Sequence, residues 1–185
     1  NISLRLADQD RSVNANGLQV HGTITKSAVA TGADLVAYSG FSASNYLEQP
    51  YNSDLDFGTG DFSIMGWVKG NSLMVFNRGL MRLEFQSFKP RMLLVDSSAN
   101  SLSYLSNTVF DTATWHCITI VKSGTTGSMF IDGVLSGSVT NASIGSFTEA
   151  NAVATLGNRN SHTEAFNGSL ALFRISATAP TAAQI

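Results

Sequence analysis

The stretch that decides the fold is Asp54-Leu55-Asp56-Phe57-Gly58-Thr59-Gly60-Asp61-Phe62-Ser63-Ile64-Met65-Gly66-Trp67-Val68-Lys69, in which an acidic, glycine-rich turn leads into an apolar strand. Successive side chains of a strand point to opposite faces, so Phe62, Ile64 and Val68 share one face, and Met65 and Trp67 share the other. Because both faces are largely apolar, we expect this strand in the middle of a two-layer structure, with Phe62, Ile64 and Val68 buried.

A second stretch repeats the alternation and adds a hairpin. Trp115-His116-Cys117-Ile118-Thr119-Ile120-Val121-Lys122 is followed by a short loop and then by Met129-Phe130-Ile131-Asp132-Gly133-Val134-Leu135. Both central positions of a type I′ turn need positive φ, which Asp tolerates and Gly prefers, so Asp-Gly between apolar residues is a strong hairpin signal. We therefore predict two antiparallel strands here, with Ile118, Ile120 and Phe130 buried.

Hydrophobic period two continues along nearly the whole chain. A strand is expected across 18–24, where Leu18, Val20, Gly22 and Ile24 share a face, and others at 81–85, 92–95, 102–105, 152–156 and 170–175. Clusters of Gly, Asn, Asp and Ser separate these runs, and residues 181–185 have room for one helical turn at most. The pattern predicts an all-β fold, a two-sheet antiparallel jelly-roll sandwich, as one domain over 1–185 with 1–15 as a lead-in segment.

The composition narrows the choice of partners. Charged residues make up 13 % of the chain and the net charge is −2, with no run of basic residues, which argues against nucleic acid and anionic membranes. No apolar run approaches the roughly 18 residues of a transmembrane helix, so we expect no membrane insertion. The single cysteine, Cys117, excludes an internal disulfide, and we expect it to be a small buried hydrophobe. The start carries neither a methionine nor a signal-peptide pattern, so we interpret the chain as part of a longer protein.

These motifs resemble the laminin-G-like branch of the concanavalin A-like lectin and glucanase superfamily. In that family an acidic-Gly turn leads into a Phe-x-(Ile/Val)-x-x-Trp strand, and a Trp-His strand and an Asp-Gly hairpin come later. Phe166-Asn167-Gly168-Ser169-Leu170-Ala171-Leu172-Phe173-Arg174-Ile175 is similar to the closing pattern of the family, and we expect Phe173 to be buried. The sequence motifs most resemble those of laminin-G-like modules in tailed-phage structural proteins. The resemblance implies a scaffold for recognition rather than for catalysis.

The glutamates argue against an enzyme. Glucanases of this superfamily carry paired glutamates on one strand, as nucleophile and acid, and such a mechanism needs two carboxyl groups about 5–10 Å apart. The glutamates of this chain are scattered along the sequence at Glu48, Glu84, Glu149 and Glu164. No Gly-x-Ser-x-Gly nucleophile motif is present either. We expect no catalytic residues.

The acidic turn also has the outline of a metal loop. Asp54, Asp56 and Asp61 place hard oxygen ligands near glycines, as a calcium loop does, but Met65 stands where an EF-hand needs a bidentate Glu. The pattern therefore favours a plain acidic turn. Laminin-G domains often hold one calcium ion at the loop rim, so the resemblance leaves one structural Ca²⁺ open.

A polar loop at 157–166 is the main candidate for ligand contacts. Sugar sites need amide, hydroxyl and guanidinium groups on loops that a rigid sheet holds. The candidate residues are Asn158, Arg159, Asn160, His162 and Glu164, with Asn77 and Arg78 as neighbours. Arg159 is the first of them, because its planar fork bonds two hydroxyls or a carboxylate at once. Trp67 and Trp115 have rings that stack on sugars, but both lie in apolar strands, so core positions are favoured.

The leading hypothesis is a non-enzymatic binding or structural domain of a phage virion protein, at a tail, fibre or capsid surface. Its partner would be a host surface glycan or a neighbouring virion protein, with homo-oligomers forming through the parent protein. The alternative is a carbohydrate-binding module of a secreted bacterial glycoside-active or adhesion protein, located outside the cell or at the bacterial surface. The sequence does not separate a sugar partner from a protein partner.

Overall fold

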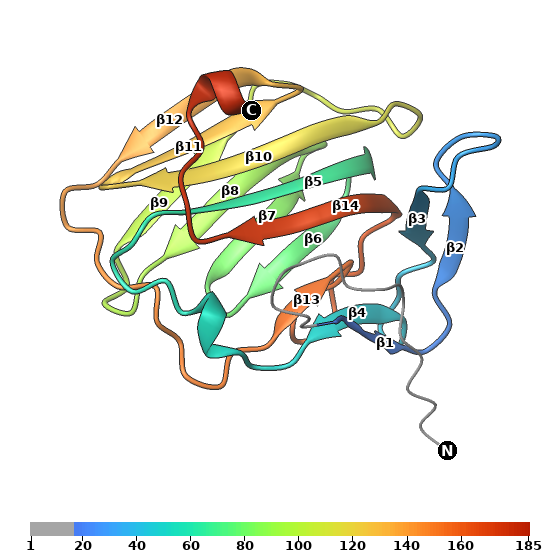
Figure 1. The fold of residues 1–185 in the computed structure, drawn as a ribbon, viewed down its shortest axis with the longest axis horizontal. Coiled ribbons are helices and arrows are strands. Elements are labelled where there is room, and N and C mark those ends of the chain that lie inside the picture. Colours follow the sequence, from blue (N-terminus) through green and yellow to red (C-terminus); the bar gives the residue numbers. More distant parts are fainter. Residues whose placement is uncertain (1–16) are drawn as a thin grey trace.

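The computed structural model describes residues 17–185, so the expected lead-in segment 1–15 lies outside the described residues. Two antiparallel sheets of seven strands each pack face to face (Figure 1). The all-β jelly-roll prediction is confirmed. No helix among the described residues has the length and apolar character needed to cross a membrane.

We call the two layers sheet A and sheet B. Sheet A has the strand order β1 (Gln19–His21), β4 (Tyr46–Gln49), β13 (Ala154–Leu156), β6 (Leu73–Arg78), β7 (Met81–Gln86), β8 (Lys89–Val95) and β9 (Ser101–Leu105). Sheet B has the order β12 (Val134–Thr140), β11 (Thr126–Ile131), β10 (His116–Ser123), β5 (Phe62–Gly70), β14 (Gly168–Ser176), β3 (Val36–Ser39) and β2 (Thr25–Ala28). Two short 3-10 helices are present, η1 (Ser53–Leu55) and η2 (Ala182–Gln184).

The core lies between the sheets and follows the predicted alternation. Phe62, Ile64, Val68, Ile118 and Ile120, which were expected to be buried, are enclosed in this core. Phe130 is buried as expected, but on the outer face of sheet B. Phe173 is only partly buried, yet it packs against the core, with its ring centroid 5.2 Å from that of Phe76. Gly66 makes room for it, because a Cβ there would stand 2.7 Å from Phe173 Cδ2. The alternation therefore identified the inner face of β5 correctly.

The expected strand across 18–24 is interrupted. β1 ends at His21, and the chain leaves sheet A at Gly22 and enters sheet B at Thr25. Gly22 has φ +67° and its α-carbon faces Asn45, so that a Cβ would clash with the Asn45 side chain. Period two alone did not reveal this break, because a glycine fits an alternating pattern as well as it fits a left-handed turn.

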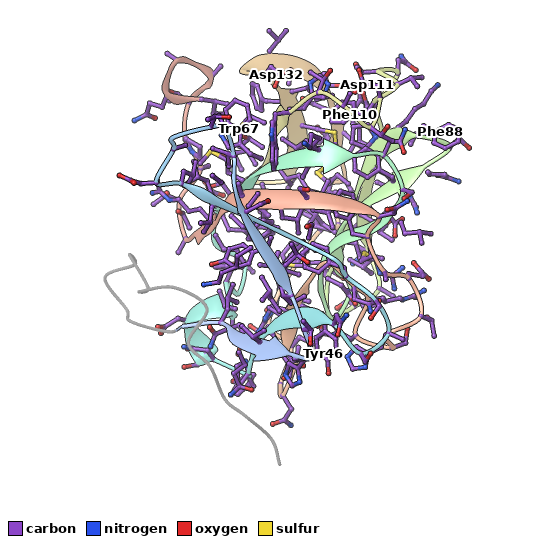
Figure 2. The ribbon with its side chains drawn as sticks, turned by 90° about the vertical axis from the view of Figure 1, so that its right-hand side faces the viewer. Tyr46, Trp67, Phe88, Phe110, Asp111 and Asp132 are labelled. Atoms are coloured by element: carbon purple, nitrogen blue, oxygen red, sulfur yellow. The ribbon has the colours of Figure 1, made fainter. Side chains whose placement is uncertain are left out.

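Trp67 is not a core residue, contrary to the expectation. Its side chain is 38 % exposed, and Trp115 and Cys117 are half-buried. The reason is parity: Phe62, Ile64 and Val68 face inward, so Trp67 must face outward from sheet B. Figure 2 shows Trp67 at the outer side of the end of the sandwich where β5 leads into β6.

The rest of this outer face is covered by the chain itself. After β14, the C-terminal segment 177–185 runs back across the strands of sheet B (Figure 1), and the Ile185 carbonyl oxygen comes near Gly133. Thr119 and Phe130, which share the outer parity, are buried. β5 is apolar on both faces. Its outer face is crossed by the C-terminal segment and is open at the end that carries Trp67.

Two internal contacts explain why the sequence motifs occur together. Asp132 and Gly133 both have positive φ, 52° and 80°, as the predicted type I′ turn requires. The Asp132 carboxylate accepts the Cys117 backbone N–H at 2.8 Å and lies 2.7 Å from His116 Nδ1, so the Asp-Gly hairpin is tied to the Trp-His strand. At the other end of β10, buried Lys122 donates to the carbonyls of Thr59 and Gly60, at 2.7 and 2.9 Å. Burial lowers the pKa of Lys122.

Candidate functional site

The loop 157–166 is held firmly by a buried amide. Asn158 is fully enclosed, and its Nδ2 donates to the Ser42 carbonyl at 2.8 Å. Its Oδ1 accepts the backbone N–H groups of Arg159 and Glu164, at 2.8 and 3.2 Å. The amide therefore closes the loop on itself and fastens it to the segment that leads into β4. A ligand cannot reach this side chain without unfolding the loop.

The loop lies against the outer face of sheet A. The Asn160 backbone N–H donates to Asn77 Oδ1 at 3.0 Å, and the Thr155 hydroxyl donates to Asn160 Oδ1 at 2.9 Å. Asn77 is buried and also donates to the Gly79 carbonyl at 2.8 Å. The predicted proximity of Asn77 to this loop is present, but Asn77, Asn158 and Asn160 use their amides to hold the scaffold.

The exposed members of the loop form a pair and a ring stack. Arg159 Nη1 bonds Glu164 Oε1, and the two side chains are 33 % and 32 % exposed. His162, with φ +57°, stacks on Tyr46 with a centroid separation of 4.1 Å. His21 stacks on the same tyrosine at 4.4 Å. Burial, with a smaller contribution from the Glu48 charge, raises the pKa of Tyr46.

The ring stack was not among the sequence-based candidates. His21, Tyr46 and His162 are distant in sequence, and only the pairing of β1 with β4 places His21 opposite Tyr46. A tyrosine between two imidazoles joins the 157–166 loop to the edge of sheet A. Of the predicted ligand-binding residues, Asn77, Arg78 and Asn158 are buried, whereas Arg159, Asn160, His162 and Glu164 are partly exposed. The ligand-binding role of these four stays a prediction.

The polar character continues across sheet A. Arg82 lies opposite Asn77 in the register of β6 and β7, and Glu84 lies opposite Arg91 in that of β7 and β8. Arg91 Nη1 bonds Glu84 Oε1 at 2.6 Å. Arg82 has a buried Nε with no hydrogen-bond partner among the described residues. The outer face of sheet A thus carries several guanidinium groups and their carboxylate partners.

Arg78 was predicted to neighbour this loop, but its side chain points elsewhere. Its side chain is fully buried, and Nη2 bonds Asp56 Oδ1 at 2.5 Å. Asp56 also accepts the Tyr51 hydroxyl at 2.9 Å and the Glu149 backbone N–H at 3.1 Å. Burial opposes ionisation of Asp56, but the hydrogen bonds from Arg78, Glu149 and Tyr51 outweigh it and hold the pKa of Asp56 below its ordinary value. Two predicted site residues therefore form one internal ion pair.

These contacts do not fit a calcium ion at the acidic turn. The Asp56 carboxylate is filled by hydrogen-bond donors, and Asp61 Oδ1 accepts the Gly124 backbone N–H at 2.8 Å. Asp54 is exposed in η1. Among residues 17–185 no group of three or more His, Cys, Asp or Glu side chains is arranged to hold a metal. In this arrangement the three aspartates do not form a set of calcium ligands. A structural Ca²⁺ stays a prediction.

A shallow depression lies near the acidic turn, at the end of the sandwich opposite to Trp67. Asp96, Phe147 and Glu149 are among the residues that line it. Asp96 accepts four N–H groups, from Ser98, from the backbone and side chain of Asn100, and from Gly145. Burial raises the pKa of Asp96, but these hydrogen bonds outweigh it and hold the pKa below its ordinary value. A general acid needs the opposite shift, so this carboxylate acts as a structural anchor.

Comparisons with known proteins agree with the fold. The sequence matches the family described as the concanavalin A-like lectin/glucanases superfamily over residues 41–185, and no curated protein matches the chain. Domain 4 of AbnA, a GH43 extracellular arabinanase from Geobacillus stearothermophilus solved with arabinotriose, superposes with a TM-score of 0.66 at 20 % identity, over 95 % of this chain and 89 % of that chain.

Two further structures are longer binding domains. That of Paraclostridial Mosquitocidal Protein 1 gives a TM-score of 0.75 at 13 % identity, over 95 % of this chain and 47 % of that one. The ligand binding domain of botulinum neurotoxin serotype D, solved with N-acetylneuraminic acid, gives 0.71 at 13 % identity, over 98 % and 48 %. The chain spans about half the length of these two domains, and such identities show a shared fold alone. The family match covers most of the sequence, and the chain therefore belongs to the concanavalin A-like lectin/glucanase superfamily.

Proposed function

We propose that this chain is a non-enzymatic carbohydrate-binding domain, whose ligand meets the outer face of sheet A at the loop 157–166. The observation that carries the proposal is the anchoring of this loop. The buried side chains of Asn158 and Asn77 hold its backbone, so Arg159, His162 and Glu164 are presented on a rigid base. Polar groups that are already in place lose little conformational entropy when they bind a sugar.

The chemistry of the exposed groups suits hydroxyl-rich ligands. The Arg159 fork donates and the Glu164 carboxylate accepts, so the pair can bond adjacent hydroxyls of one ring. The imidazole of His162 adds a further donor or acceptor beside them. Two structurally similar domains were solved with sugars, arabinotriose in one and N-acetylneuraminic acid in the other, which supports a glycan as the ligand class.

The biological setting is part of the proposal. We place the domain on a phage virion, where it contacts a host surface glycan or a neighbouring virion protein. Its sequence motifs resemble those of tailed-phage modules, and its low charged fraction is common in virion and extracellular β proteins. The second candidate is a binding module of a secreted bacterial glycoside-active protein, which the similarity to domain 4 of an arabinanase favours. Strong binding to arabinan rather than to envelope polysaccharides would favour the second setting.

The test is an array of bacterial envelope polysaccharides and arabinan oligosaccharides, probed with the wild type and with Arg159→Ala. We expect Arg159→Ala to weaken binding by about 1–3 kcal/mol, the range for a charge-assisted hydrogen bond, with little change in melting temperature. Arg91→Ala is the matched control, since it removes an ion-paired arginine from the same face without touching the loop. Normal binding by Arg159→Ala, or no binding by the wild type to any glycan, would contradict the proposal.

A further inference from the structure

The two tryptophans of the chain lie together on the opposite layer, away from the loop 157–166. Trp67 on β5 faces Cys117 on β10, and Trp115 precedes Cys117 by two residues, which makes the two tryptophans diagonal neighbours across the strand pair. Diagonal residues lie about 7–8 Å apart, within reach of aromatic side chains. In Figure 2, Trp67 lies near one margin of the molecule and Tyr46 near another, so this patch is separate from the ring stack.

A lysine on the same face of β5 as Trp67 lies over the ring of Trp115. Lys69 follows Trp67 on the same face of β5, and its Nζ lies 5.5 Å from the Trp115 ring centroid. This cation–π contact holds the ammonium group over the ring of Trp115. None of the ion pairs among residues 17–185 involves Lys69, so its charge is not neutralised by a carboxylate.

The neighbours of Trp67 across the sheet are small residues. Trp67 pairs with Ala171 of β14 on one side and with Cys117 of β10 on the other, and Ala171 is buried. Leu172 follows at a bulge of β14, with φ +49° and its side chain exposed. A leucine in the left-handed region is strained, and such strain gathers at functional positions. The C-terminal segment 177–185 crosses the strands of sheet B (Figure 1), whereas Trp67 is 38 % exposed.

We propose that Trp67, Lys69 and Trp115 form a second carbohydrate site, specific for acidic sugars. The C–H bonds on the face of a pyranose carry partial positive charge and stack on the negative face of an indole. The Lys69 ammonium, which forms no ion pair with a carboxylate among residues 17–185, then bonds the carboxylate of a uronic or sialic acid. A protein partner would need about 1,000 Å² of buried surface, whereas this patch presents two aromatic side chains and one lysine.

The test uses the intrinsic fluorescence of the protein, because the only two tryptophans of the chain are both in the patch. Wild-type protein is titrated with oligogalacturonate, hyaluronan hexasaccharide and oligosialic acid, and with fully methyl-esterified oligogalacturonate as the uncharged match. We expect at least one acidic chain to give a saturable change in emission, with binding about tenfold or more tighter than for an uncharged chain. No response to any of the three acidic chains, or equal binding of the ester, overturns the proposal.

Variants separate the two parts of the site. Trp67→Ala should abolish the response, Lys69→Met should reduce acidic binding to the level of the ester, and Lys69→Arg should restore it. Phe88→Ala is the matched control, since Phe88 is another exposed aromatic side chain, at the opposite side of the view in Figure 2. Unchanged binding by Trp67→Ala, measured by calorimetry, overturns the proposal. Failure of iodide to quench the free protein also does so, because the patch would then be covered by another copy.

The two sites fail independently. Arg159→Ala is expected to lose array binding while it keeps the fluorescence titration, and Trp67→Ala is expected to show the reverse. If neither variant changes its own readout, both assignments are wrong. If only one variant changes its own readout, that site is retained and the other assignment is wrong.

Discussion

The two outer faces of the sandwich use their side chains in opposite ways. On sheet A, polar residues are bonded to one another, as Arg91 is to Glu84 and Arg159 to Glu164, and a loop is fastened over them by buried amides. On sheet B, the outer face of β5 carries the apolar Met65 and Trp67, and the C-terminal segment crosses the sheet while Trp67 stays open at one end. A strand with two apolar faces therefore does not imply two buried faces, because one of them can be left for a partner.

The largest expected effect on the free energy of unfolding distinguishes the inward-facing from the outward-facing side chains of β5. Phe62→Ala removes a fully buried ring and should lower the free energy of unfolding by about 3–5 kcal/mol. Trp67→Ala removes a ring that is 38 % exposed, and about 1–2 kcal/mol is expected from the smaller buried area. Urea unfolding of both variants gives the comparison. Equal losses would mean that Trp67 is enclosed after all.

A second prediction concerns the anchor of the polar loop. Asn158→Ala leaves the Arg159 and Glu164 backbone N–H groups without their acceptor, and it should cost about 2–3 kcal/mol. Amide hydrogen exchange should rise across 157–166 and stay unchanged at β10 and β11. Protection of the loop in the variant equal to that in the wild type would show that the ring stack on Tyr46, rather than the amide, fixes the loop.

Acid should weaken the end of the sandwich near Asp96 and Asp56. Both carboxyl groups have a folded-state pKa below the ordinary value of 3.8, so their stabilisation is present above that value and is lost as the pH falls through the folded-state pKa. Asp96→Asn should lower stability at neutral pH by about 1–3 kcal/mol. It should also flatten the fall of stability below pH 4. An acid profile as steep as that of the wild type would assign the effect to other carboxyl groups.

Local patterns predicted the fold well because they act over a few residues. The Asp132-Gly133 turn and the inward alternation of Phe62, Ile64 and Val68 follow from φ preferences and strand geometry, and both are present. The alternation of side chains also predicts that Trp67 faces outward, since it points to the face opposite to Val68. This prediction was missed because both faces of the strand are apolar, and an apolar pattern alone does not show which face is the inner one.

Contacts between distant strands were beyond the reach of the sequence. Asp56 and Arg78 each looked like site residues, and only the packing of the rim showed that they bond each other. The loop 157–166 was recognised by its polar composition, which does not separate an amide that anchors a loop from one that meets a ligand. His21, Tyr46 and His162 carry no local signal, since their stack depends on the pairing of β1 with β4.

The smallest expected change in stability belongs to the ion pair at the centre of the proposed glycan site. Arg159 and Glu164 are each about one third exposed, and exposed ion pairs contribute about 0–1 kcal/mol because solvent and salt screen them. A double-mutant cycle of Arg159→Ala and Glu164→Ala should therefore give a coupling energy below about 1 kcal/mol in unfolding. The same cycle measured on glycan binding should give a larger coupling, because a sugar ring that bonds both groups joins them and excludes water. A coupling energy that is larger in unfolding than in binding would mean that the ion pair holds the loop together and does not contact a ligand. The Trp67 patch on sheet B would then be the remaining candidate for the ligand-binding surface.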